Sequence, residues 1–182
     1  MDASELNTLL DQVRPYVQEV QVQAVNSETF INSETATSIK RDSPIKIIFA
    51  NNSDQLTDEQ KNDIKSARGT DFEFDPSIQY GSVIPNSSAN TDSGGNVVLS
   101  TDDFATSVPL SFSVQPVYAN TTSQLVNSVI LKSKESMESL TSFKLKIAKS
   151  IVRSDGITLQ DEFISNSGFT TGATSVININ FE

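Results

Sequence analysis

Short segments in which apolar and polar residues alternate recur along the chain, and they constrain the fold more than any other feature. In segment 19–25, EVQVQAV, valine and alanine fall at every second position with glutamine between them. Alternation with a period of two places one set of side chains on each face of a strand. Strands of this kind bury one face only, which is typical of antiparallel sheets. Further segments that predict strands are 44–50, 72–78, 96–100, 107–118, 143–147, 155–159 and 173–182.

Two of these segments also carry signals of their place in a sheet. Segment 44–50, PIKIIFA, is apolar enough to be a central strand. Segment 107–118 alternates as well, but Pro109 and Pro116 stand near its ends. Because proline has no N–H to donate to a neighbouring strand, we predict an edge strand there.

Three segments show helical signals. Residues 4–14 place leucine and valine at i, i+3, i+4 and i+7, directly before a proline that ends the pattern. Segment 57–69 begins with a capping box of Thr57 and Gln60 and ends at a glycine. Segment 121–140 repeats the capping-box pattern and places apolar residues at helical spacing, so we predict a second long helix there.

The order of these segments shows no regular alternation of strand and helix. It therefore predicts the α+β class, with a mostly antiparallel sheet or sandwich and about three helices, one of them N-terminal, on one face. We expect residues 1–15 to form the N-terminal helix, which can serve as an assembly arm. We expect residues 16–182 to form a single α+β domain.

The tetrapeptide NSET occurs twice, at 26–29 and 32–35. Two copies are too few for a repeat architecture, which has periods of ~20 residues or more. Asn-Ser is typical of turns. We therefore predict two turns that flank a short strand around Phe30, and treat a functional repeat as the weaker alternative.

The residue types that are missing exclude many chemistries. The chain has no histidine, cysteine or tryptophan, which removes Ser-His-Asp triads, thiol catalysis and nearly all structural zinc sites. Segment 90–96 resembles part of a calcium loop, but Gly94 and Thr101 stand where that loop has acidic residues. We expect no enzyme activity, cofactor or metal; a carboxylate enzyme with Asp103 or Asp161 as its acid is the weaker alternative.

The charge of the chain excludes some partners. The formal net charge is −10, which argues against nucleic acid as the main partner and against an anionic membrane surface. No apolar run reaches the ~18 residues of a spanning helix. The start of the chain, MDASEL, has no positive and no apolar region, so we expect no signal peptide and synthesis in a cytoplasm.

Basic residues gather in one part of an otherwise acidic chain. Residues 132–153 hold six basic and two acidic residues, whereas the remainder holds 7 basic and 21 acidic ones. Opposite charges on one molecule favour contacts between copies. We therefore predict a subunit contact through Lys132, Lys134, Lys144, Lys146, Lys149 and Arg153; a solvated surface is the alternative.

These features together favour a structural role. We expect a non-enzymatic homo-oligomeric subunit of a large symmetric assembly that binds copies of itself and other assembly proteins. A bacteriophage virion component of the tail, neck or head surface is the setting that we favour. The alternative is an adhesin-like or fibre-type binding module, in which the Ser/Asn-rich loops at 85–96 and 165–174 contact a ligand such as a glycan.

Overall fold

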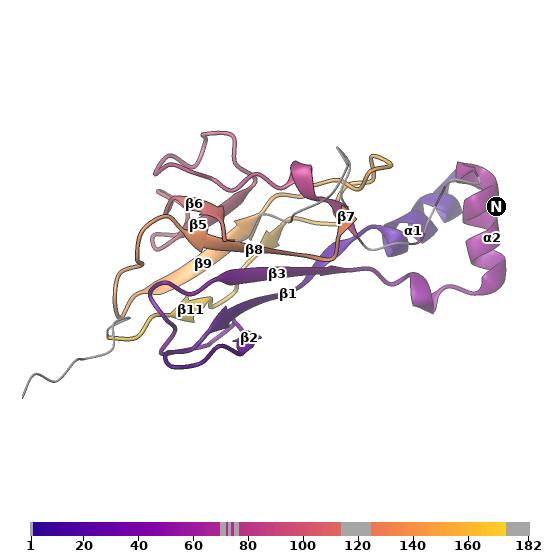
Figure 1. The fold of residues 1–182 in the computed structure, drawn as a ribbon. Helices are drawn as coiled ribbons and strands as arrows, with labels where there is room; N and C mark the ends of the chain where they lie inside the picture. Colours follow the sequence, from indigo (N-terminus) through magenta and orange to yellow (C-terminus); the bar gives the residue numbers. More distant parts are fainter. Residues whose placement is uncertain (1, 70–71, 73, 75–76, 114–124, 174–182) are drawn as a thin grey trace, which may run out of the picture.

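Alternating burial along the strands builds two antiparallel sheets in a computed structural model, which describes residues 2–69, 72, 74, 77–113 and 125–173 (Figure 1). The first sheet has the order β2 (Phe30–Asn32), β1 (Tyr16–Gln23), β3 (Ile45–Ala50), β8 (Ser128–Ser133) and β6 (Leu110–Phe112). In the second sheet, β9 (Ser142–Ile147) pairs with β5 (Val97–Ser100), β10 (Phe163–Ile164) and β11 (Phe169–Thr170). A separate two-stranded ladder joins β4 (Ile78–Gln79) to β7 (Leu125–Val126).

The two sheets enclose one apolar core. In β3 the buried residues are Ile45, Ile47 and Phe49, and in β9 they are alternate residues from Phe143 to Ile147. Residues of both sheets belong to a single cluster. Each fully buried side chain of this size contributes roughly 1.5–3 kcal/mol relative to an exposed one. The expectation of an α+β fold with mostly antiparallel sheets is confirmed.

The chain crosses between the sheets on both sides of the sandwich. On one side Ile39 bridges Ala24, just after β1, to Thr171, just after β11. On the other side Val108 pairs with Leu99 of β5, and the chain then enters β6 at the edge of the first sheet. The edge strand predicted at 107–118 is therefore confirmed for β6, while residues 114–118 lie outside the described residues.

The two α-helices lie beyond one end of the sandwich and not over a sheet face (Figure 1). Helices α1 (Ala3–Val13) and α2 (Asp58–Arg68) both begin with a capping box, and two 3₁₀ turns occupy Ser53–Gln55 and Tyr80–Ser82. Helix α2 buries only Ile64, which is enough to pack against α1 but not to cover a sheet. Among the described residues, no helix combines the length and the apolar character that a bilayer crossing requires.

The helix predicted at 121–140 is wrong, so the described residues contain two α-helices and not about three. Residues 125–133 form β7 and β8 instead, and residues 121–124 lie outside the described part. Val129 and Leu131 face the core because β8 pairs with the central strand β3. This stretch is rich in β-branched residues, and pairing with a neighbouring strand overrides the local helical spacing.

Candidate functional site

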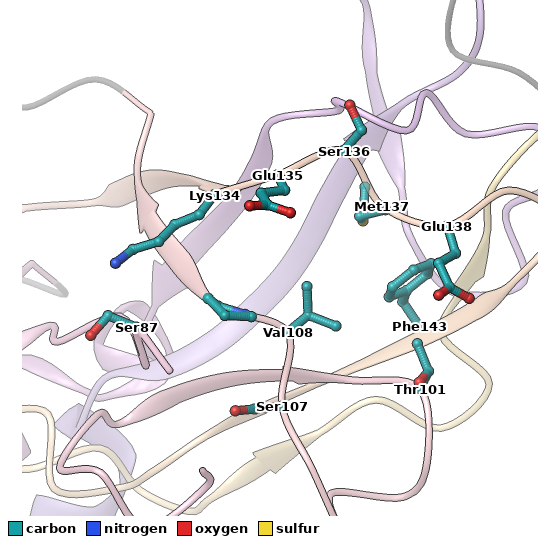
Figure 2. Close-up of a pocket in the computed structure, with 11 residues that line it drawn as sticks. Ser87, Thr101, Ser107, Val108, Lys134, Glu135, Ser136, Met137, Glu138 and Phe143 are labelled. Carbon is teal, nitrogen blue, oxygen red and sulfur yellow. The ribbon is translucent and has the colours of Figure 1, made fainter. Parts of the chain in front are cut away.

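A pocket of about 450 Å³ lies between two connections of the sandwich (Figure 2). Both connections stand at the end of the sandwich away from α1 and α2 (Figure 1). One wall is the connection between β5 and β6, residues 101–109. The other wall is the turn between β8 and β9, residues 134–141. The lining residues are Ser87, Thr101, Ser107, Val108, Pro109, Lys134, Glu135, Ser136, Met137, Glu138 and Phe143.

The turn that forms the second wall is held to three other segments by backbone hydrogen bonds and by one bond from a side chain. The Lys134 N–H donates to the Pro109 carbonyl at 2.9 Å. The Met137 N–H donates to the Arg41 carbonyl at 2.8 Å, and Arg41 Nε donates back to the Met137 carbonyl at 2.5 Å. The Leu140 N–H donates to the Gly172 carbonyl at 3.1 Å. The pocket is therefore a fixed feature of the fold.

The pocket has an apolar centre and a charged margin. Val108 is half-buried at this centre, and Met137 and Phe143 lie almost fully buried beneath it. The charged side chains that line the pocket, Lys134, Glu135 and Glu138, are exposed at its margin (Figure 2). An apolar centre inside a polar rim is the usual anatomy of a protein–protein contact.

Loop 85–96 is organised around the side chain of Asn86, which is fully buried. Its Nδ2 donates to Ser107 Oγ at 2.7 Å and to the Ser88 carbonyl at 3.0 Å, while Ser93 Oγ donates to its Oδ1. Gly95 packs so closely that a Cβ there would lie 2.6 Å from the Asn86 Cβ. This polar loop therefore satisfies many of its polar groups internally and presents Ser87 to the pocket in a fixed place.

The calcium-like pattern at 90–96 does not gather its oxygens. Asn90 Oδ1 accepts the Asp92 N–H at 2.9 Å, and Asn96 Oδ1 accepts the Ile84 N–H at 2.8 Å. These oxygens serve the backbone of the loop. Within the part of the chain that the structure describes, no group of three or more acidic residues could hold a metal ion.

The other candidate loop, 165–173, is tied to the second NSET copy, while residue 174 lies outside the described part. The Glu34 carboxylate accepts the backbone N–H groups of Asn166, Ser167 and Gly168 at 3.0, 2.7 and 3.2 Å. In the first copy Glu28 pairs with Lys40 at 3.0 Å. The two copies are turns on either side of β2, as predicted, but the role of Glu34 was missed, because no local pattern announces a partner 132 residues away.

The structure separates the basic residues of 132–153 because β8 and β9 lie in different sheets. Lys132 is exposed beside Ser111 on the outer face of the first sheet, and Lys134 lies at the pocket. Lys144 and Lys146 point outward from the second sheet, and Lys149 is exposed just after β9. The six residues do not form one surface.

Arg153, the last of the six, is buried at 4 % exposure near the two helices. It pairs with Asp155 at 2.9 Å and donates to the Val13 carbonyl at 3.5 Å. Its guanidinium lies 5.5 Å from the centre of the Phe72 ring. In this structure Arg153 is a packing residue inside the chain and offers little charge to a neighbouring copy.

Loop 101–107 lies against the outward lysines of the second sheet. Lys144 Nζ is 3.8 Å from the Asp103 carboxylate, and Lys146 Nζ is 4.5 Å from the centre of the Phe104 ring. Hydrogen bonds from Thr106, and then from Ser100, lower the pKa of Asp102 to about 2. The same hydrogen bonds join the two ends of this loop. Asp103 and Asp161, the candidate acids, are both exposed.

Comparisons with known proteins give no assignment. No protein-family model, curated protein sequence or solved structure matches this chain. The function proposed below therefore rests on the geometry of the chain itself.

Proposed function

We propose that the chain is a non-enzymatic structural subunit that assembles with copies of itself into a large symmetric particle. A bacteriophage virion component of the tail, neck or head surface is the setting that we favour. The internal hydrogen bonding of the loops supports this proposal, since it gives the molecule a fixed surface shape. Turnover that is lost on Asp103→Asn or Asp161→Asn would contradict the non-enzymatic part.

The observation that carries the proposal is a pair of short strand edges with exposed isoleucines. Among the described residues, β2 pairs only with β1, and β10 pairs only with β9. Ile31 of β2 stays 38 % exposed although its partner Val22 is buried in the core, and Ile164 of β10 is 49 % exposed. Neither strand contains a lysine or a proline, the residues with which monomeric proteins block such edges.

The two edges lie on the same side of the sandwich. Glu34 and Thr35, which directly follow β2, bond to the turn at 166–168 between β10 and β11. A neighbouring copy on this side would cover both exposed isoleucines and pair with free backbone groups. This is the kind of lateral contact that rings and stacks use.

Blocking both edges tests the proposal. We expect the double variant Ile31→Lys/Ile164→Lys to fold but to form at least about tenfold less oligomer, since a charged edge opposes strand pairing. Ile84→Lys is the matched control, because Ile84 is also 49 % exposed but lies outside the strands. Multi-angle light scattering and electron microscopy give the readout. A wild-type chain that stays monomeric at every concentration would refute the proposed function.

The three lysines on the second sheet form a smaller version of the predicted basic contact, which we retain as a proposal. Reversing Lys144, Lys146 and Lys149 to glutamate should leave the sheets folded, because these side chains point outward. We expect weaker self-association, most clearly at low salt, where charges are least screened. Light scattering at low and high salt measures it. Unchanged assembly at both would rule out this electrostatic contact.

A binding module is the second candidate, favoured by the fixed geometry of loop 85–96. Because Asn86 organises this loop in advance, a ligand such as a glycan would lose little free energy to loop ordering. A monomer with saturable ligand binding that Asn86→Ala abolishes would favour this module over the assembly subunit.

A further inference from the structure

Leu140 is an exposed apolar side chain on a strained backbone. Its φ is 52°, in the left-handed region, and its side chain is 71 % exposed, the most of any large apolar residue described. The Leu140 N–H bond to the Gly172 carbonyl holds this conformation. Leucine rarely adopts left-handed backbone, where glycine or asparagine fits without strain. Burial among the described residues therefore does not explain a leucine at this position.

The pocket described above is lined by residues of the turn that carries this leucine. Leu140 follows Met137 by three residues in the same fixed turn, and Met137 lines the pocket. Val108 and Pro109 supply the rest of an apolar centre that the described side chains leave open. A projecting leucine and an apolar hollow therefore stand next to each other at one end of the molecule.

We propose that two copies of this chain exchange Leu140 across a two-fold axis, each leucine entering the pocket of the other copy. The inference rests on the proposed function and names the partner at this end. A projection and a hollow on the same surface are self-complementary in a two-fold contact, where residue i meets j and j meets i. The volume of about 450 Å³ also has room for residues that flank the leucine.

The charged margin of the pocket fits a second copy as well. Lys134 lies at this margin with Glu135 and Glu138, so each copy presents both signs. A two-fold axis can bring the lysine of one copy to a glutamate of the other. Rim pairs of this kind set orientation and the rate of encounter more than affinity. Association at this end should therefore keep most of its strength in salt.

Replacing the leucine tests the projection. We expect Leu140→Asn to raise the dimer dissociation constant at least about 30-fold, the effect of losing an interface anchor. The melting temperature should stay level or rise, because asparagine tolerates the left-handed backbone. Ile84→Asn, another exposed apolar residue, is the control and should leave dimerisation unchanged. Sedimentation velocity over a concentration series measures the effect.

Filling the hollow tests the other half of the contact. Ser136 is exposed and lines the pocket, so Ser136→Trp should occupy it without disturbing the core. We expect this variant alone to dimerise as poorly as Leu140→Asn. Mixing the two variants should restore dimers that carry one intact contact, since one chain keeps its leucine and the other keeps its pocket.

The outcomes separate this inference from the proposed function. Wild-type-like dimerisation of Leu140→Asn, or no recovery on mixing, would overturn the exchange of Leu140. Assembly that persists in that case but disappears in Ile31→Lys/Ile164→Lys leaves the proposed function standing on the strand edges. A wild-type chain that never self-associates would refute both the exchange of Leu140 and the proposed function.

Discussion

Replacing Arg153 with alanine is expected to lower the free energy of unfolding by about 4 kcal/mol, because a largely buried ion pair and the packing of a long side chain are lost together. The guanidinium is almost fully buried, 2.9 Å from the Asp155 carboxylate, and lies over the Phe72 ring. Alanine would remove the ion pair and the packing of the side-chain stem together, and would leave a cavity beside α1.

Two further variants separate these contributions. Arg153→Met keeps much of the side-chain volume, and only the charged contacts disappear. It should therefore lower the free energy of unfolding roughly half as much as Arg153→Ala does. Lys149→Ala, at an exposed position in the same basic stretch, should change stability by less than about 0.5 kcal/mol. Urea unfolding followed by circular dichroism measures all three. If Arg153→Ala unfolds like the wild type but assembles poorly, Arg153 is a surface contact after all.

The burial of Arg153 shows that the distribution of charge along the sequence does not by itself predict which residues share a surface. Alternation at 143–147 correctly predicted a strand, and it implied that Lys144 and Lys146 point outward. Nothing in the sequence indicated that Lys132 belongs to the other sheet. Nor did it indicate that Arg153 is buried in the turn that its N–H closes with the Ile157 carbonyl. Charge counted along a chain therefore predicts a surface only within one element, where the period of the side chains is known.

The helix predicted at 121–140 was wrong for a similar reason. Apolar residues spaced for a helix also alternate locally, as Val129 and Leu131 do, and a central neighbour strand decides between the two patterns. Helices with their own start and stop signals were predicted almost to the residue, since α2 runs between Thr57 and Gly69. Capping residues therefore predicted the helices correctly. Where the apolar spacing fits both a helix and a strand, pairing with a neighbouring strand decided the structure.

The candidate site was the least predictable part of the molecule. Its pocket is built by two turns that follow different sheets, and its walls depend on Arg41, Asn86 and Gly172 from three other segments. The sequence did mark loop 85–96 as a surface of interest, because it is polar and rich in turn residues. The sequence could not show that several polar groups of this loop form hydrogen bonds with the buried Asn86 side chain.

Gly168→Ala is expected to be the most damaging small substitution, with a loss of about 4 kcal/mol or no folding at all. Gly168 has a φ of 71°, and a Cβ there would overlap the Phe143 carbonyl oxygen and lie 2.9 Å from its carbon. Phe143 belongs to β9, and its ring stacks on Phe169 at 5.5 Å between centroids. Relief of the overlap would thus have to move the middle of the second sheet.

Alanine variants of three other glycines separate the two causes of this loss of stability, which are backbone strain and steric overlap. Gly156→Ala, with a φ of 85° and open space around it, should lose about 1 kcal/mol from backbone strain alone. Gly95→Ala, which meets the Asn86 backbone without left-handed strain, should lose about 3 kcal/mol from overlap alone. Gly81→Ala faces neither cost and should be nearly neutral. If Gly168→Ala loses no more than Gly156→Ala, β9 yields to the added methyl group, and the turn at 166–168 is not the rigid clamp that its bonds to Glu34 imply.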